Sequence, residues 1–128
     1  MQISSPGPKV FMSDLGDYLR KQREQRRQSD PQFSLRKVAQ RIGVQPSYLS
    51  KVERGSEGSP SEETLRRLAE DLNEDADILL ALGGKISTDL ASIIRKRPQL
   101  FAELIRDLKD IPDHAVLRIV REVRDGNW

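Results

Sequence analysis

Residues 34–55 read SLRKVAQRIGVQPSYLSKVERG, and this stretch decides the fold. Ser34 is a candidate N-cap, because its hydroxyl can accept a hydrogen bond from a free amide in the first helical turn. Gly43 suits the left-handed backbone that ends a helix, and Pro46 suits the first position of the next helix. We therefore predict two short helices, each of about two turns, joined by a tight turn.

Apolar residues in this stretch recur at helical spacing and leave one face of the second helix polar. We expect the inward residues to be Val38, Ala39, Ile42, Val44, Leu49 and Val52. The outward set contains no acid and comprises Gln45, Ser47, Tyr48, Ser50, Lys51 and Arg54. Glu53, by its spacing, should face back toward the helix that precedes this pair, where we expect an ion pair with Arg23. A rigid helix with such a polar face fits a DNA major groove, which is about 12 Å wide.

Helical patterns continue on both sides of this pair. A preceding helix with Leu15 and Leu19 inside is predicted to start after Ser13 and to run through charged residues to the turn at Ser29-Asp30-Pro31. A fourth helix carries Leu65, Leu68, Ala69 and Leu72; its capping box is Ser59-Pro60-Ser61-Glu62, with Ser61 as a competing cap. A fifth, short helix carries Ile78, Leu79 and Leu82 and ends at Gly83-Gly84.

These elements, in this order, resemble the XRE family, the lambda-repressor/Cro-type helix-turn-helix regulators. The resemblance covers residues 13–82 and rests on Leu19-Arg20-x-x-Arg23, residues 34–39, Ile42-Gly43-Val44, residues 46–55, and the pattern from Pro60 to Leu72. It implies an all-α, five-helix, lambda-repressor-like DNA-binding domain. The polar region Glu24–Phe33 is longer than the family's usual short loop. It would either extend the first helix or lay Arg26 and Arg27 along the DNA backbone.

The resemblance also implies roles for single residues. Ser47 and Lys51 would reach base edges, with Gln45 at the mouth of the groove and Pro46 limited to an apolar contact such as a thymine methyl. Phosphate contacts would come from Arg36, Tyr48 and Arg54 and from the free amides that begin the helix at residue 35. Each residue also has a plainer interpretation: Lys51 and Arg36 as solvated surface charges, and Tyr48 as a half-buried packing residue.

The chain is predicted to have three parts. Residues 1–12 contain two prolines and a glycine and are expected to form a flexible arm, residues 13–84 the DNA-binding domain, and residues 85–128 a C-terminal helical oligomerisation region. This last part holds many apolar residues at helical spacing, among them Leu90, Ile93, Leu100, Leu104, Leu108, Val116, Val120 and Val123. So short a segment would struggle to bury them alone. They would pack on the preceding domain or, as we expect, on a second copy of the chain.

Composition narrows the classes of function. The 128 residues include no cysteine and one histidine, His114, which excludes disulfides, thiolate zinc sites and all-histidine metal sites. We find no phosphate-binding loop, dinucleotide-binding glycine pattern or nucleophile–base pair, and expect neither an enzyme nor a cofactor. No apolar run is long enough to span a membrane and no secretory signal is visible, so a cytoplasmic protein is expected.

Charge is distributed unevenly along the chain. Residues 1–58 hold 11 Lys+Arg against 6 Asp+Glu, whereas residues 59–84 hold 2 against 7. A basic first half fits a surface that binds a polyanion, although local imbalances of this size also arise by chance. The leading hypothesis is a sequence-specific DNA-binding regulator, a repressor that binds a near-palindromic operator as a homodimer. The alternative is an antitoxin or partner-controlled regulator whose C-terminal helices bind a toxin, protease or anti-repressor.

Overall fold

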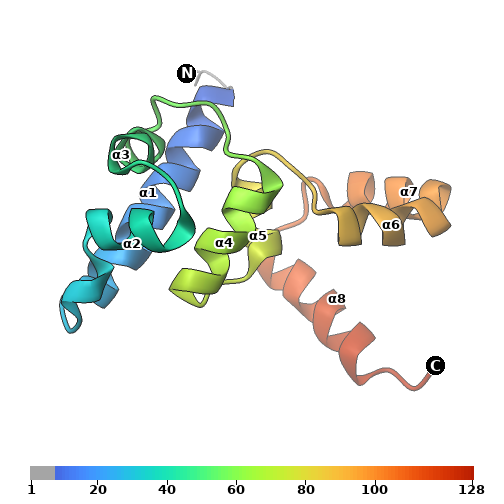
Figure 1. The fold of residues 1–128 in the computed structure, drawn as a ribbon. Coiled ribbons are helices and arrows are strands. Elements are labelled where there is room, and N and C mark those ends of the chain that lie inside the picture. The colour runs from blue at the N-terminus through green and yellow to red at the C-terminus, as the bar shows by residue number, and fades with distance from the viewer. Residues whose placement is uncertain (1–7) are drawn as a thin grey trace, which may run out of the picture. The chain divides into compact units, whose positions relative to one another are not determined.

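The computed structural model describes residues 8–128, with side chains from residue 14 onward, and within this range every regular element is helical (Figure 1). The elements are α1 (Pro8–Arg27), the 3-10 helix η1 (Pro31–Phe33), α2 (Leu35–Ile42), α3 (Pro46–Arg54), α4 (Glu62–Leu72), α5 (Ala76–Leu82), α6 (Thr88–Lys96), α7 (Pro98–Leu108) and α8 (Asp113–Asp125). The chain forms two compact units, Met1–Leu90 and Ala91–Trp128. The all-α prediction is therefore confirmed.

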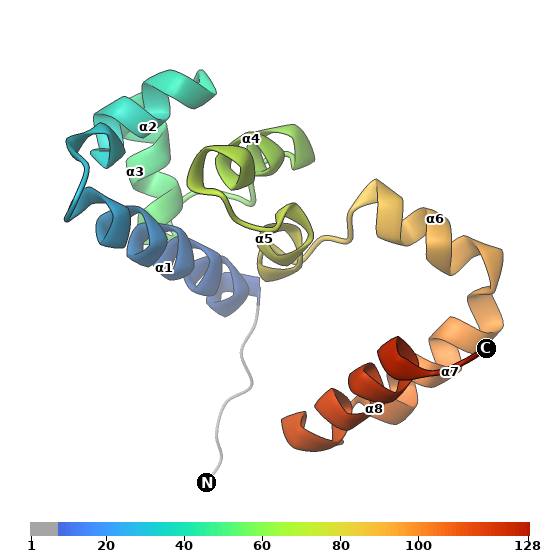
Figure 2. The same ribbon diagram turned by 90° about the horizontal axis from the view of Figure 1, so that it is seen from below.

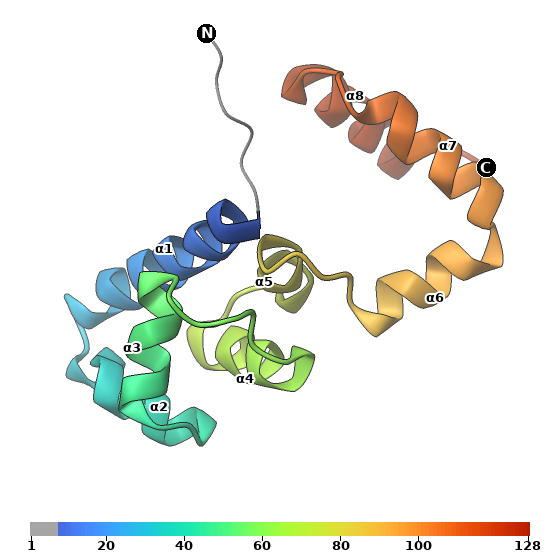
Figure 3. The same cartoon turned by 90° about the horizontal axis from the view of Figure 1, so that it is seen from above.

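The core of the first unit is made by the apolar stripes of α1 to α5. Figures 2 and 3 both show α3 between α1 and α2, and α1 packs on α5, which in turn packs on α4. The buried apolar side chains are Leu15, Leu19, Val38, Ala39, Ile42, Leu49, Val52, Leu65, Leu68, Ala69, Leu72, Leu79 and Leu80. Each short helix thus contributes one stripe, and α3 is held on several sides.

The first helix starts earlier than the sequence indicated. It begins at Pro8, so residues 8–12, predicted to belong to a flexible arm, are helical, while residues 1–7 lie outside the described range. The physical reason is that proline is well suited to the first helical position, where its missing N–H has no partner to lose. A proline at this point opens a helix rather than excluding one.

The start of α4 corrects a second detail. Ser61, and not Ser59, caps this helix: its Oγ accepts a hydrogen bond from the Thr64 amide at 3.2 Å, and the helix begins at Glu62. Pro60 therefore lies before the cap and is buried. The prediction of a capping box that begins at Ser59 is therefore wrong. The competing candidate, Ser61, is the cap because the Thr64 amide, three residues further along the chain, lies within hydrogen-bond distance of its hydroxyl.

The polar region between α1 and α2 is compact. The first helix runs to Arg27 and is followed by η1, whose cap Asp30 accepts a hydrogen bond from the Gln32 amide at 2.9 Å. Of the two possibilities for this region, the structure shows the extended helix. Ser34 then caps α2 as predicted, accepting from the Lys37 amide at 3.2 Å.

The first unit extends past Gly84, where the sequence suggested a boundary, to Leu90. Lys85 Nζ donates to the Pro60 carbonyl at 3.0 Å, and Thr88 Oγ1 donates to Glu62 at 3.0 Å. Ser87 is fully buried and caps α6 by accepting from the Leu90 amide. These contacts tie residues 85–90 to the beginning of α4.

The second unit, Ala91–Trp128, is a set of helices without an interior. No side chain of α6, α7 or α8 is buried. Most of the large apolar side chains that are exposed in the described chain lie between residues 86 and 128. Residues 8–128 contain no helix with the length and apolar content needed to cross a bilayer.

Candidate nucleic-acid interface

The turn between α2 and α3 has the geometry that the sequence predicted. Gly43 adopts φ 79° and ψ 31°, and the Val44 amide donates to the Ala39 carbonyl at 3.0 Å. A Cβ at Gly43 would lie 3.6 Å from the nearest side-chain atom, on Arg67, so space is available and the left-handed backbone is what favours glycine. The tight turn sets the angle at which α3 leaves α2.

The face of α3 that points inward carries its single acid. Leu49, Val52 and Glu53 are buried, and Gly55 ends the helix at φ 74°. The predicted contact residues divide by exposure: Arg36, Gln45, Ser47, Lys51 and Arg54 are exposed, whereas Pro46, Tyr48 and Ser50 are half-buried. The exposed surface of α3 therefore presents polar and cationic side chains without a carboxylate.

An arginine–carboxylate pair connects α1 to α3. Arg23 Nε lies 2.7 Å from Glu53 Oε2, and Arg23 Nη2 lies 3.0 Å from Glu53 Oε1. Arg23 also donates to the Phe33 carbonyl at 3.1 Å, which extends the connection to η1. The predicted ion pair is confirmed, and it raises the pKa of Arg23 chiefly through the hydrogen bonds to Glu53. Two buried charges with this geometry hold α3 in one orientation.

A close backbone contact between the same helices was not predicted. A Cβ built on Gly16 of α1 would lie 2.5 Å from the Val52 carbonyl oxygen and 2.6 Å from that of Glu53. Only glycine allows α1 and α3 to approach this closely. The signal in the sequence was an isolated glycine inside a helical pattern, which disfavours the helix and so points to a packing requirement.

Several arginines, whose partners the local sequence does not identify, form ion pairs that connect the helices of the first unit. Arg26 Nη2 pairs with Glu74 at 2.9 Å, and the Tyr18 hydroxyl donates to the same carboxylate. Arg41 pairs with Asp71 at 2.6 Å. These contacts join α1 and α2 to α4 and the connection after it. Arg26, whose placement along DNA was one possibility, is engaged in this scaffold.

The side chains around α3 are held to different degrees. Arg54 Nη1 donates to Ser50 Oγ at 2.6 Å, one helical turn back. Gln45 is the N-cap residue of α3, but its side chain makes no capping hydrogen bond. Tyr48 packs against the core, and burial, with a smaller effect from Glu57, raises the pKa of its phenol. Gln45 thus keeps its amide for another partner, whereas Tyr48 is partly committed to packing.

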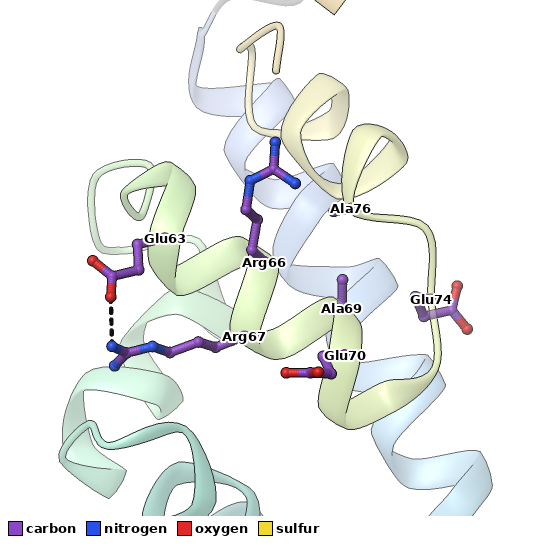
Figure 4. Close-up of a pocket in the computed structure, with 7 residues that line it drawn as sticks. All are labelled: Glu63, Arg66, Arg67, Ala69, Glu70, Glu74 and Ala76. Atoms are coloured by element: carbon purple, nitrogen blue, oxygen red, sulfur yellow. Dashed lines mark hydrogen bonds and ion pairs between the residues drawn. The ribbon is translucent and has the colours of Figure 1, made fainter. Parts of the chain in front are cut away.

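A different surface lies along α4 and the start of α5 (Figure 4). A shallow pocket of about 410 Å³ is lined by acidic, basic and small residues: Glu63, Arg66, Arg67, Ala69, Glu70, Glu74 and Ala76. Figure 4 shows Glu63 and Arg67 directed at one another, and they form an ion pair along the helix. Cations and carboxylates that pair with each other give this surface no preference for a polyanion.

The chain is similar in sequence to known proteins. Two proteins of Mycobacterium tuberculosis, each described as an uncharacterized HTH-type transcriptional regulator and found in strains CDC 1551 and H37Rv, are 36% identical over 80 residues. The match covers 62% of this chain, and the chain spans about half, 53%, of the length of these relatives.

Similarity also extends to a solved structure and to a family of domains. One similar solved structure is the crystal structure of the clp gene regulator ClgR from Corynebacterium glutamicum. Its sequence is 27% identical to this one, the match covers 77% of this chain and 90% of the ClgR chain, and the TM-score is 0.47. The family described as a helix-turn-helix domain matches residues 14–81, just over half of the 128 residues. This range spans α2, the turn at Gly43 and α3, and the chain therefore belongs to the helix-turn-helix domain family.

Proposed function

We propose that this protein binds double-stranded DNA in a sequence-specific manner through α3, inserted in the major groove. The observation that carries the proposal is the asymmetry of this helix. Its one carboxylate, on Glu53, is turned inward and paired with Arg23, while Ser47, Lys51 and Arg54 face solvent. A helix that hides its acid and exposes its donors suits the acceptor-rich edges of base pairs and the phosphates beside them.

We propose individual roles for residues of α3 and α2. Lys51 and Ser47, both exposed, are proposed to reach base edges, with lysine suited to the O6 and N7 atoms of guanine. Gln45 lies at the start of the helix, and Pro46 offers only an apolar contact. Arg36, Arg54 and the Tyr48 hydroxyl are proposed to contact phosphates, Tyr48 with its ring still packed on the core.

We further propose that the protein acts as a homodimer through residues 85–128. The α7 and α8 helices line an apolar groove of about 470 Å³, formed by Leu104, Leu108, Val116, Ile119, Val120, Val123 and Arg124. The α6 helix carries Leu90 and Ile93, which are 39% and 50% exposed. A second copy of the chain would cover these surfaces on both partners, and symmetric pairing is the commonest way in which a soluble chain does so.

A homodimer has a consequence for the DNA sequence that it reads. Two α3 helices related by a two-fold axis would enter successive major grooves about 34 Å apart and would require a near-palindromic site. A repressor is the simplest regulator with this design, because occupancy of the operator is by itself enough to exclude other proteins.

The decisive experiment selects bound sequences from random DNA with the full-length protein and with a Lys51→Ala variant. We expect a near-palindromic motif for the parent and a relaxed preference at one base pair of each half-site for the variant, at a cost of about 1–3 kcal/mol. Arg36→Ala is the control, since losing a phosphate contact should weaken all sites equally. Equal binding of random and selected DNA by the parent would contradict sequence-specific recognition.

The apolar groove also supports a second candidate function, in which the C-terminal helices bind another protein such as a toxin, protease or anti-repressor. The two candidates differ in what the purified chain does alone. Sedimentation equilibrium should give a dimer at micromolar concentration if the groove is covered by a second copy. A monomer that retains its exposed apolar surface would favour the heterologous partner.

A further inference from the structure

A small pocket beside the exposed face of α3 brings together residues from three helices. It has a volume of about 280 Å³ and is lined by Arg20, Arg23, Glu24, Leu35, Ser50, Glu53 and Arg54. Leu35 is the first residue of α2, so the positive end of that helix lies at the pocket's edge. The pocket thus lies where α1, α2 and α3 meet.

The charges around this pocket do not cancel. Arg23 and Glu53 neutralise each other through their two hydrogen bonds, and Glu24 lies 3.0 Å from Arg23 Nη2. Arg20 and Arg54 are both exposed, and neither forms an ion pair with any side chain of residues 14–128. The guanidinium groups of Arg20 and Arg54 therefore face the pocket without an ion-pair partner among those residues, and the charged residues that line the pocket, with Glu24 and Glu53 included, carry a net charge of +1.

We propose that this pocket binds one phosphodiester group of the DNA backbone, with Arg20 and Arg54 as its cationic ligands and Ser50 as the residue that positions Arg54. The inference rests on the proposed DNA binding and adds to it Arg20 of α1, a residue that was not among the predicted contacts. Guanidinium groups match the geometry of a phosphate, and two from different helices would clamp it from two sides.

Ser50 acts through Arg54 and does not read a base. Its Oγ accepts a hydrogen bond from Arg54 Nη1 at 2.6 Å, which turns the guanidinium back along α3 toward the pocket. Ser50 is half-buried, whereas Ser47 and Lys51 on the same helix are exposed. A hydroxyl already engaged in this way has less freedom to reach a base edge.

The test of Arg20 is the salt dependence of DNA binding by the full-length protein. Arg20→Gln should weaken binding of selected and random duplexes by the same factor, about five- to tenfold near 0.1 M salt. The plot of log K against log salt has a negative slope, and the substitution should make this slope less steep by about 0.9. Lys21→Gln is the matched control, because Lys21 is exposed on the same helix but does not line the pocket. It should leave the slope closer to that of the parent.

Each result has a defined meaning. If Arg20→Gln changes neither affinity nor slope, or changes them only as Lys21→Gln does, the pocket proposal is wrong while DNA binding stands. If the parent binds random and selected DNA equally, sequence-specific recognition is wrong, but the slope still tests the pocket on random DNA. A parent that binds no DNA overturns both. Inorganic phosphate that shifts the Arg20 side-chain NMR signal, with DNA affinity unchanged by Arg20→Gln, would mean a site for the free anion and would overturn the assignment to DNA.

Ser50 is tested by a double-mutant cycle on the same duplexes. Ser50→Ala should weaken binding less than Arg54→Gln, without changing the preferred bases, and should have no further effect once Arg54 is replaced. Additive effects of the two substitutions, or a changed base preference in Ser50→Ala, would contradict the positioning role.

Discussion

Arg23 and Glu53 lie thirty residues apart in sequence, yet they form a two-pronged buried ion pair that fixes α3 against α1. Their side chains are 5% and 6% exposed, and the closest N–O distance is 2.7 Å. Because both side chains are almost completely excluded from solvent, Glu53 depends on Arg23 for its counter-charge, whereas Arg23 has Glu24 as a second, more exposed partner. The orientation of the proposed recognition helix is thereby linked to the stability of the domain.

Removing one partner of this pair should be costly. Glu53→Gln leaves the buried guanidinium with only the more exposed carboxylate of Glu24, 3.0 Å from Arg23 Nη2, as a counter-charge. We expect the free energy of unfolding to fall by about 2–3 kcal/mol, less than for a fully uncompensated buried charge, as measured by urea denaturation. The double replacement Arg23→Met with Glu53→Leu removes both charges and should lose much less. A single variant as stable as the parent would show that the pair does not hold the helix.

The contact at Gly16 predicts a steric effect. In Gly16→Ala, the new methyl group would meet the carbonyl oxygens of Val52 and Glu53 at about 2.5 Å, and the two helices must separate. We expect the free energy of unfolding to fall by about 1–3 kcal/mol, although alanine is intrinsically the better helix former. Gly58→Ala is the control, because nothing lies within 4 Å of a Cβ at that position. Equal stability of the two variants would argue against the close approach.

The two tyrosines provide a prediction about pH. The pKa of Tyr18 is raised mainly by its hydrogen bond to Glu74, and the pKa of Tyr48 mainly by burial. The folded state therefore holds both phenolic protons more tightly than the unfolded state does. Their contribution to stability is complete below the unfolded pKa of about 10 and is lost as the pH rises through the folded values.

Ultraviolet titration of the phenolates measures this directly, because the chain has two tyrosines in all. The midpoint for the native protein should lie above that of the protein in denaturant, and Glu74→Gln should lower the midpoint of one tyrosine only. Coincident native and denatured titrations would contradict both environments.

The apolar groove of the second unit predicts that assembly and DNA binding are linked. Val120→Glu places a charge among Leu104, Val116 and their neighbours and should shift the full-length protein toward monomer in sedimentation. Binding of a palindromic duplex should then weaken by a larger factor than binding of a single half-site. His114→Glu introduces a carboxylate at an exposed position of the same helix outside the groove and should retain the dimer. Identical behaviour of the two variants would place the interface elsewhere.

The local features of the fold could be predicted from sequence because each has a short-range cause. The cap at Ser34, the left-handed turn at Gly43 and the start of α3 at Pro46 all depend on residues a few positions apart. The predicted starts of α1 and α4 were wrong because local sequence alone does not decide them. Proline and neighbouring serines permit more than one local solution, and packing selects among them.

Most of the long-range polar contacts could not be predicted from the sequence. The pairs Arg26–Glu74 and Arg41–Asp71 join segments far apart in the chain, and charged residues on helix surfaces have no periodicity that identifies their partners. The Arg23–Glu53 pair could be predicted because Glu53 is the single acid on a helix whose other charged residues are cations, and its spacing placed it on the inward face. Arg20 was missed as a candidate because it belongs to a helix that was assigned to the scaffold, and its pocket exists only once three helices are in place.

The contact of Gly16 with the backbone of Val52 and Glu53 also bears on how such a protein diversifies. No layer of side chains separates α1 from α3 at this point, so the backbones themselves set the distance between the two helices. On the proposed mode of DNA binding, exchanging residues at positions 47 and 51 would change the recognised sequence while the packing of the domain stays the same. In a mutational scan that measures folding stability, tolerance should be high at those two positions and low at residue 16.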